Sequence, residues 1–240
     1  MLSIVIPCYN ESGNIHLLME RFAEVAKANE DIEVIFVDNG STDNSAEVFK
    51  SELKKYSILP FRVVRIEKNQ GYGHGILEGL RNAKGETLAW THADMQTDPL
   101  DVLTGFDLFN KNKGKYSTLL IKGKRKDRPF LDEVFTKGME LFASGMLKAR
   151  LNDINAQPKI FSRQFFDEIQ ANAPLDFSLD LYFLYHAKKY GQVLDFSVYF
   201  NRRLHGEAKG GGSLKTKYKL TKRTFNYICD FKTKNIDGKY

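Results

Sequence analysis

Short apolar segments rich in β-branched residues alternate with segments of helical periodicity through the first hundred residues. Each apolar segment has the length of a buried strand and ends in a polar cluster. This alternation predicts an α/β fold, with an open, mostly parallel sheet flanked by helices. The expected strands cover residues 2–6, 32–37, 61–66 and 87–90, and the expected helices cover residues 15–26, 46–56 and the segment after Gly71.

Polar residues gather where three of these expected strands end. The clusters cover residues 7–11, 38–41 and 92–96. Ligands of open α/β sheets bind beyond the carboxyl ends of the strands. The three clusters therefore predict a binding site along one edge of the sheet.

The pattern is looser beyond residue 100, although no internal repeat and no second core are evident. We expect a single domain over residues 1–205, followed by a basic helical tail over residues 206–240 that begins with a glycine-rich joint. In this half we expect helices at 102–109, 130–151 and 179–190, strands at 116–121, 160–161 and 193–199, and a basic loop at 122–129.

Composition excludes several classes of protein. Hydrophobic residues make up 42% and charged residues 28% of the chain, which excludes collagen-like and disordered chains. Cys8 and Cys229 lie at opposite ends and provide neither a disulfide framework nor a metal-ligand spacing. No apolar run approaches the roughly 20 residues that cross a bilayer, and the first residues lack the pattern of a signal peptide. We therefore expect a cytoplasmic location.

Positive charge is concentrated in the tail. Residues 206–240 hold nine Lys or Arg and three Asp or Glu, which accounts for the whole net charge of +6. An apolar stripe runs through these bases, at Leu214, Tyr218, Thr221, Phe225 and Ile228. The stripe suits a peripheral helix on the cytoplasmic face of an anionic membrane. It equally suits a helix that docks on the body or on the second subunit of a homodimer. No nucleic-acid-binding motif is present.

Asp94 and Gln96 form a candidate cation site after the fourth expected strand. A carboxylate with a second oxygen ligand two residues on suits Mg²⁺ or Mn²⁺, which would neutralise a departing diphosphate. The alternative is a plain turn, since residues 97–99 can cap the next helix. Asp38 likewise suits either a hydrogen bond to a nucleoside or an Asx-turn before Gly40.

Five motifs, in this order and at these spacings, resemble those of family 2 glycosyltransferases. The closest match is to the polyprenyl-phosphate group, which includes dolichol-phosphate mannose synthase. The resemblance spans residues 2 to about 210 and implies the Rossmann-like GT-A fold. The matching segments are VIPCYNE at 5–11, VDNGSTD at 37–43, NQGYG at 69–73, ADMQTDP at 93–99 and RLHGEAK at 203–209.

The resemblance also implies roles for individual residues. Asp94 and Gln96 would bind Mg²⁺ or Mn²⁺ on the diphosphate of the donor. Arg125 and Arg203 would contact phosphate groups, with Lys209 as a weaker candidate. The residues expected to hold the nucleotide-sugar are Pro7, Tyr9, Glu11, Asp38, Gly71, His92, Ala93 and Asp94.

Three positions depart from the family pattern. His92 replaces the first Asp of the family's DAD motif, which favours Mn²⁺, weaker metal binding or a changed role, because neutral histidine suits Mg²⁺ poorly. Asn39 replaces the second Asp of VDDGS. Residues 153–159 read DINAQPK where the family has DxxxGFR, which affects contacts on the acceptor side.

The resemblance implies an inverting transfer from a UDP- or GDP-sugar, and the acceptor decides the mechanism. A polyprenyl phosphate is already ionised at neutral pH, so its transfer relies on orientation and charge neutralisation. A saccharide acceptor would need a general base, for which Asp180 is the candidate. Asp180 is otherwise an ordinary carboxylate at a helix start. A third hypothesis is a non-catalytic GT-A binding module, which His92 favours.

Overall fold

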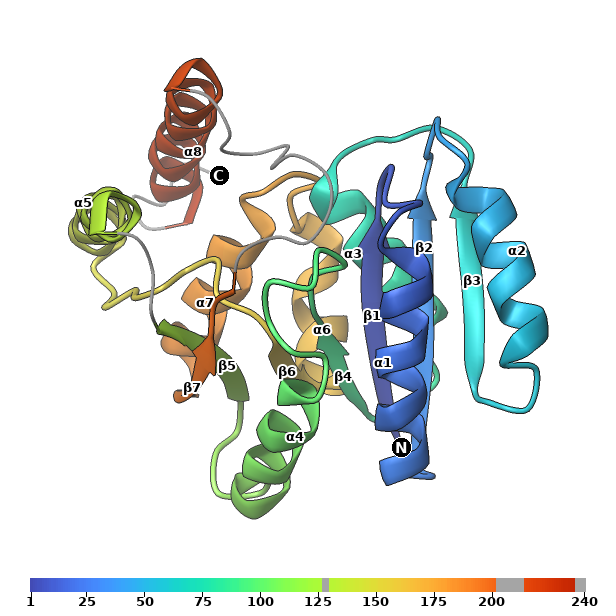
Figure 1. Cartoon of the computed structure of the whole chain (residues 1–240). Coiled ribbons are helices and arrows are strands. Elements are labelled where there is room, and N and C mark those ends of the chain that lie inside the picture. Colours follow the sequence, from blue (N-terminus) through green and yellow to red (C-terminus); the bar gives the residue numbers. More distant parts are fainter. Residues whose placement is uncertain (127–129, 202–213, 236–240) are drawn as a thin grey trace.

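The computed structural model describes residues 1–126, 130–201 and 214–235 (Figure 1). Seven strands and eight α-helices alternate along this part of the chain. The elements are β1 (Leu2–Cys8), α1 (Ile15–Ala28), β2 (Ile32–Asn39), α2 (Ser45–Lys55), β3 (Phe61–Ile66), α3 (Tyr72–Asn82), β4 (Thr87–Trp90), α4 (Asp101–Asn112), β5 (Leu119–Lys126), α5 (Phe130–Leu147), β6 (Lys159–Ser162), α6 (Arg163–Ile169), a short 3₁₀ turn (Gln170–Asn172), α7 (Leu179–Tyr190), β7 (Gln192–Tyr199) and α8 (Leu214–Asn235).

The strands form one sheet in the order β3-β2-β1-β4-β6-β5-β7. Only β6 runs antiparallel to its neighbours, β4 and β5. The strands at the centre of a mostly parallel sheet are covered on both faces and are continuously apolar. All residues of β2 are buried, and from Val34 to Val37 the strand is continuously apolar. The prediction of a mostly parallel α/β sheet is confirmed.

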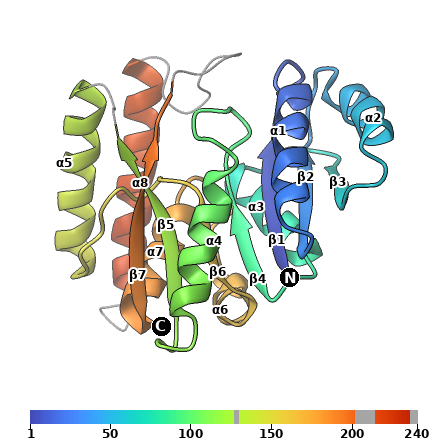
Figure 2. The same ribbon diagram turned by 60° about the horizontal axis from the view of Figure 1, so that its bottom comes forward.

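Helices cover both faces of the sheet. Helices α1, α2 and α4 lie on one face, and α3, α6 and α7 lie on the other. Helices α5 and α8 lie side by side next to the β5–β7 end of the sheet (Figure 2).

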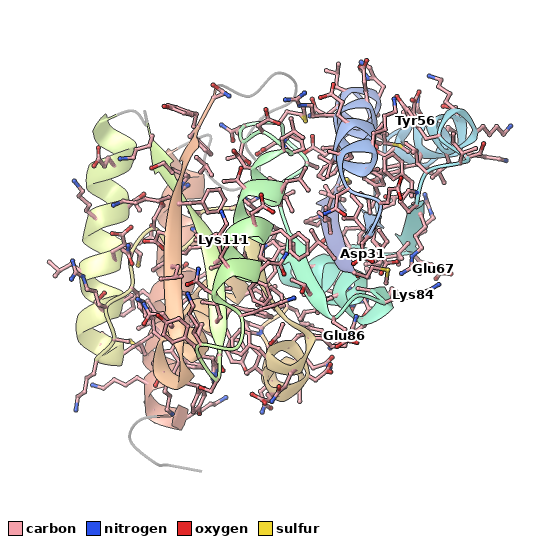
Figure 3. The ribbon with its side chains drawn as sticks, turned by 90° about the horizontal axis from the view of Figure 1, so that it is seen from below. Asp31, Tyr56, Glu67, Lys84, Glu86 and Lys111 are labelled. Atoms are coloured by element: carbon pink, nitrogen blue, oxygen red, sulfur yellow. The ribbon has the colours of Figure 1, made fainter. Side chains whose placement is uncertain are left out.

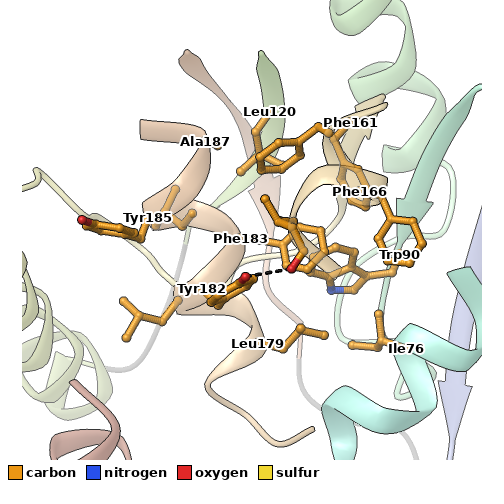
Figure 4. Packing of buried hydrophobic residues seen from close by; sticks show 14 of the residues in the cluster. Ile76, Trp90, Leu120, Phe161, Phe166, Leu179, Tyr182, Phe183, Tyr185 and Ala187 are labelled. Carbon is orange, nitrogen blue, oxygen red and sulfur yellow. Dashed lines mark hydrogen bonds between the residues drawn. The ribbon is translucent and has the colours of Figure 1, made fainter. Parts of the chain in front are cut away.

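Aromatic rings fill the core beneath the second face (Figure 4). The Trp90 ring meets the rings of Phe161 and Phe183 edge-on, with centroids 5.3 Å and 4.8 Å away. Edge-to-face contacts are a preferred geometry for aromatic pairs. They fix the end of β4, from which the loop at 91–96 leaves the sheet.

Glycines let α3 approach the sheet closely. A side chain at Gly79 would place its Cβ 2.3 Å from a methyl carbon of Val5, and one at Gly75 would lie 2.7 Å from the amide of Asn39. Such distances are too short for any side chain. These two glycines therefore let α3 pack directly against β1 and β2.

The expected basic loop at 122–129 is wrong for residues 122–126, which continue β5. These residues pair in register with β7, from Lys122 opposite Asp195 to Lys126 opposite Tyr199. The Lys122 ammonium is fully buried and lies 3.2 Å from the Asp195 carboxylate. Pairing with β7 thus supplies the partner that a charged strand needs. Residues 127–129 lie outside the described residues.

The described part of α8 docks on the body. Ile228 is fully buried and Phe231 is 5% exposed, both within the main core. Phe225 stacks on Phe142 of α5 with ring centroids 4.7 Å apart. None of the described helices has the length and apolar character to cross a bilayer.

His186 on α7 is a buried histidine without hydrogen-bond partners among the described residues. Its ring lies 4.4 Å from that of Tyr182 and 5.9 Å from that of Phe231, and neither ring nitrogen is bonded. Burial, together with the charge of Lys189, lowers the pKa of His186 from 6.5 to about 4. His186 therefore binds a proton near pH 6.5 in the unfolded chain but only near pH 4 in the folded chain.

We expect His186→Phe to stabilise the fold and to make its free energy of unfolding less sensitive to acid pH. Removing unsatisfied buried nitrogens should raise the free energy of unfolding at neutral pH by about 1 kcal/mol. Stability of the native sequence should fall by about 3 kcal/mol more than that of the variant as the pH drops from 7 to about 4, by the linkage above. Urea denaturation measures both effects, and His16→Phe at an exposed histidine is the control. Parallel pH profiles for the native sequence and His186→Phe would contradict this account.

Candidate donor site

The candidate site lies where β1, β2 and β4 end. The chain builds the sheet outward from β1 in both directions, so β1 pairs in parallel with β2 on one side and with β4 on the other. Ligands of open α/β sheets bind at such a switch point. The three polar clusters predicted from the sequence follow these strands and meet at this edge.

Hydrogen bonds join the loop after β1 to the loop after β2. The backbone N–H of Asn10 donates to the Ser41 hydroxyl over 3.0 Å, and the Asn10 side-chain oxygen accepts from the Thr42 N–H over 2.8 Å. The Asp43 carboxylate accepts from Ser12 and Ser45. Burial alone would raise the pKa of Asp43, but these bonds outweigh it and the pKa falls below its ordinary value.

Asp38 is held at the end of β2 by two donors. Its side chain is 1% exposed, and its oxygens accept from Arg65 over 2.6 Å and from the Ser41 N–H over 3.0 Å. Arg65 lies opposite Asp38 in the register of β2 and β3, and half of its side chain is exposed. The sequence analysis did not identify Arg65. The feature that could have identified it is its place near the end of β3, beside the end of β2 in the sheet. The Asp38 carboxylate is thus enclosed, and the half-exposed Arg65 guanidinium is the part of this pair that faces solvent.

Pro7, Tyr9 and Glu11 lie on the same edge. Pro7 is the second-last residue of β1, and Tyr9 and Glu11 follow in the loop, all three half-buried. The Glu11 carboxylate accepts from the Asn14 side chain over 2.6 Å, which orients it at the start of α1.

The loop after β4 carries Asp94 and Gln96. Asp94 is 9% exposed, and its carboxylate accepts from the Gln96 N–H over 3.2 Å. Gln96 is bound in turn to Asn201, just after β7, through its side-chain amide and its backbone carbonyl. The loop is thus tied to a strand at the far end of the sheet.

The oxygen atoms that this loop offers as metal ligands fit a hard divalent cation. Asp94 offers carboxylate oxygens and Gln96 an amide oxygen, which are ligands that Mg²⁺ and Mn²⁺ accept. Among the described residues, no cluster of three His, Cys, Asp or Glu side chains forms a metal site. This small donor set suits a cation that takes its other ligands from water and a diphosphate.

His92 begins a stack of side chains that reaches α8. The Tyr72 ring lies 6.1 Å from the His92 ring and stacks on Phe177 at 4.7 Å. The Arg223 guanidinium lies 5.9 Å from the Phe177 ring and pairs with Asp176 over 3.0 Å. These contacts link the loop after β4 to helix α8 through the rings of His92, Tyr72 and Phe177.

Gly71, next to Tyr72, packs closely against the loop before α7. Its φ of 126° is a left-handed conformation open to glycine. A Cβ there would lie 2.3 Å from the Leu175 carbonyl oxygen, and the Gly71 carbonyl accepts from Asn39 over 2.9 Å. Gly71 thus brings the loop before α7 against α3. Ala93, between His92 and Asp94 in the loop after β4, is buried.

Asp180 lies beneath this edge, in the interior. It is 2% exposed, forms an ion pair with the fully buried Lys159 and accepts from the Gln157 amide over 2.8 Å. Burial lowers the pKa of Lys159, and the Asp180 charge opposes that shift. Burial and the Asp180 charge raise the pKa of Tyr72 well above its ordinary value. The structure therefore places Asp180 in a buried ionic network.

Arg125 at the end of β5 is bound to Asp153. Its backbone N–H and its Nε donate to the Asp153 carboxylate over 2.7 Å and 2.9 Å. Burial would raise the pKa of Asp153, but Arg125 outweighs it and the pKa is lowered. A phosphate at Arg125 would have to share it with Asp153. Arg203 and Lys209 lie outside the described residues.

Known proteins resemble this chain in sequence. The model of "Glycosyl transferase family 2" matches residues 3–168. The uncharacterized glycosyltransferase YkcC of Bacillus subtilis is 29% identical over 70% of this chain and 51% of its own length. A dolichol-phosphate mannosyltransferase of Pyrococcus furiosus is 26% identical over 87% of this chain and 58% of its own length. The chain thus spans little more than half the length of these relatives.

Solved structures share the fold. A mannosyltransferase of Pyrobaculum calidifontis, in complex with GDP-Man and Mn²⁺, has a TM-score of 0.65 at 18% identity, covering 85% of this chain and 58% of that one. The glucosyl-3-phosphoglycerate synthase of Mycobacterium tuberculosis, in complex with Mn²⁺, UDP and phosphoglyceric acid, has a TM-score of 0.74 at 16% identity, covering 96% and 78%. These similarities confirm the GT-A fold. Since the family model covers more than half of the chain, this protein belongs to glycosyl transferase family 2.

Proposed function

We propose that this chain transfers a sugar from a UDP- or GDP-sugar to a polyprenyl phosphate, with inversion at the anomeric carbon. The observation that carries the proposal is the convergence of Asp38 and Asp94 on one edge, at the ends of β2 and β4, which both flank β1. The relatives support the acceptor. A dolichol-phosphate mannosyltransferase and a dodecaprenyl-phosphate galacturonate synthase, 24% identical over 95% of this chain, are among them.

In this proposal the donor lies across the ends of β1, β2 and β4. Asp38 and Arg65 contact the nucleoside, with Pro7, Tyr9 and Glu11 along the adjoining loop. Asp94 and Gln96 would hold Mg²⁺ or Mn²⁺, which would neutralise charge on the departing diphosphate. The bonds from Gln96 to Asn201 fix the loop in place before the donor arrives, so little ordering is left to occur on binding.

The transfer is a direct displacement. An oxygen of the acceptor phosphate forms a bond to the anomeric carbon, while the bond from that carbon to the diphosphate oxygen breaks and the nucleoside diphosphate leaves. The acceptor oxygen is ionised at neutral pH, so no side chain has to remove a proton. The cations Arg125 and Arg203 would orient the acceptor phosphate, and Arg125 would exchange part of its contact with Asp153. A polyprenyl acceptor implies peripheral contact with the cytoplasmic face of a membrane.

The alternatives are a saccharide acceptor and a non-catalytic GT-A binding module. A saccharide acceptor requires a general base. A binding module is favoured by one observation, that His92 stands where the family has the first metal-site carboxylate and packs against Tyr72.

Nucleoside diphosphate release tests the function. We expect release with Mn²⁺, one nucleotide-sugar and a polyprenyl phosphate, and no release when a free sugar replaces the lipid. A thermal-shift screen of UDP-, GDP- and CMP-sugars selects the donor, because binding to the native state raises the melting temperature. Release with the saccharide and without the lipid would contradict the lipid acceptor and support a saccharide acceptor. Absence of any nucleotide binding with Mn²⁺ would support the binding module.

We expect Asp94→Asn to lower turnover on the order of a hundredfold, because one oxygen of the cation site loses its charge. The same assay measures the loss. Asp107→Asn, at an exposed carboxylate on α4, is the matched control and should retain the native rate. Undiminished turnover in Asp94→Asn would contradict the proposed metal site.

We expect His92→Asp to strengthen metal binding about tenfold, because a second carboxylate would join Asp94 in the donor set. The readout is the Mn²⁺ concentration that gives half-maximal nucleotide binding in calorimetry. An unchanged or weaker dependence on Mn²⁺ would mean that His92 lies away from the cation.

A further inference from the structure

The end of α7 and the residues that end and follow α5 line an open surface cavity of about 440 Å³. It is lined by Leu147, Lys148, Ala149 and Arg150 at and just after the end of α5 and by Tyr185, Lys188 and Lys189 on α7. Helix α7 leads through Gly191 directly into β7, so the cavity lies near the edge at which β5 and β7 begin. The candidate donor site is at the opposite edge, where the strands end. The volume falls within the roughly 300–1,000 Å³ of small-molecule sites.

Four cations line this cavity, which we call the basic pocket: Lys148, Arg150, Lys188 and Lys189. No carboxylate lines it, and within the described part of the chain none of the four forms an ion pair or a side-chain hydrogen bond. Lys148, Arg150 and Lys189 are exposed and Lys188 is half-buried, so these like charges repel one another through a shell of water and salt. An anion in the pocket would remove this repulsion.

Lys148 is exposed and has a left-handed backbone conformation that residues other than glycine rarely adopt. Its φ is +51°, and the Ala149 N–H donates to the Ser144 carbonyl over 3.2 Å. This bond marks a Schellman motif, in which glycine usually occupies the left-handed position. A lysine at this position strains the backbone, and such strain is typical of residues that bind a ligand.

Lys189 is held in place by aromatic rings. Its ammonium lies 5.2 Å from the centre of the Tyr190 ring and 5.9 Å from that of Tyr185, which forms part of the cavity wall. Cation–π contacts of this kind reduce the freedom of a long side chain. A favourable helix dipole explains cations in the last turn of α7, but it does not explain their convergence with Lys148 from a second helix.

We propose that the basic pocket binds a phosphate-bearing anion. Compact lysine ammonium groups suit phosphate oxygens as point charges. Arg150 also lines a second cavity, of about 380 Å³, that contains Glu133, Glu140 and Asp153, so the three lysines carry most of the binding. The phosphate can belong to a free metabolite or to a lipid headgroup.

Calorimetric titration of pyrophosphate into the full chain tests the site. Chelator is present, so that cation-bridged binding at the donor edge does not contribute. We expect the double variant Lys188→Gln/Lys189→Gln to bind at least about tenfold more weakly, and binding to the native sequence to weaken with salt. The matched control, Lys111→Gln/Lys113→Gln, removes two exposed cations from the end of α4, where Figure 3 labels Lys111. Native affinity in the first variant, or an equal loss in the control, would overturn the proposal.

Lys148→Gly separates binding from folding. Glycine relieves the left-handed strain, so we expect the melting temperature to rise by a few degrees. The affinity for pyrophosphate should nevertheless fall several-fold. A purely structural lysine would give the first change without the second, and that result would count against the pocket.

Vesicle sedimentation identifies the source of the phosphate. If the ligand is a lipid headgroup, phosphatidylcholine vesicles that contain phosphatidylserine should bind the native chain better than Lys188→Gln/Lys189→Gln. If it is a free phosphate, the two proteins should sediment equally while their pyrophosphate affinities differ. Because no donor sugar or metal is used, these results are independent of the transferase proposal. Failure of the native chain to bind either ligand would overturn the inference.

Discussion

The parallel pairing of β1 with both β2 and β4 is the constraint on which the candidate site depends. The register sets Cys8 opposite Asp38, and the first residue beyond β4, Thr91, donates its N–H to the Val5 carbonyl over 3.1 Å. The loops that carry Tyr9, Asp38 and Asp94 therefore leave the sheet next to one another. Since side chains alternate between the two faces along a strand, a register shift of one residue in β2 would turn Asp38 to the other face. The position of the site thus follows from backbone pairing before any ligand is considered.

Buried ion pairs organise the other half of the sheet. Lys122 and Lys159 lie opposite each other on β5 and β6, and each is fully buried with an aspartate as its partner. Asp180 is buried as well, so removing it would leave the Lys159 charge uncompensated, at a cost of about 3–5 kcal/mol. Several residues whose types suggest chemistry, Asp153 and Asp180 among them, therefore have a structural explanation in this region.

The sequence was informative where local pattern and tertiary structure agree. The first four strands are short apolar runs between polar turns, and the structure has all four. The pattern failed at Lys122–Lys126, because the pairing with β7 that makes this charged segment a strand is set more than sixty residues later. It also missed α6, which begins where the Ser162 hydroxyl accepts from the Phe165 N–H. Arg65 and the burial of Asp180 depend on contacts between distant elements, so no local pattern reveals them.

The surroundings of Asp180 bear on the choice of acceptor. A general base has to reach the acceptor hydroxyl and accept its proton. Asp180 is enclosed instead, with the Lys159 ammonium and the Gln157 amide on the same carboxylate oxygen. Protonating this carboxylate would leave the buried ammonium without its partner, which opposes the transfer. A phosphate acceptor avoids the difficulty because it arrives already ionised, and this favours polyprenyl phosphate over a saccharide as the acceptor at this edge of the sheet.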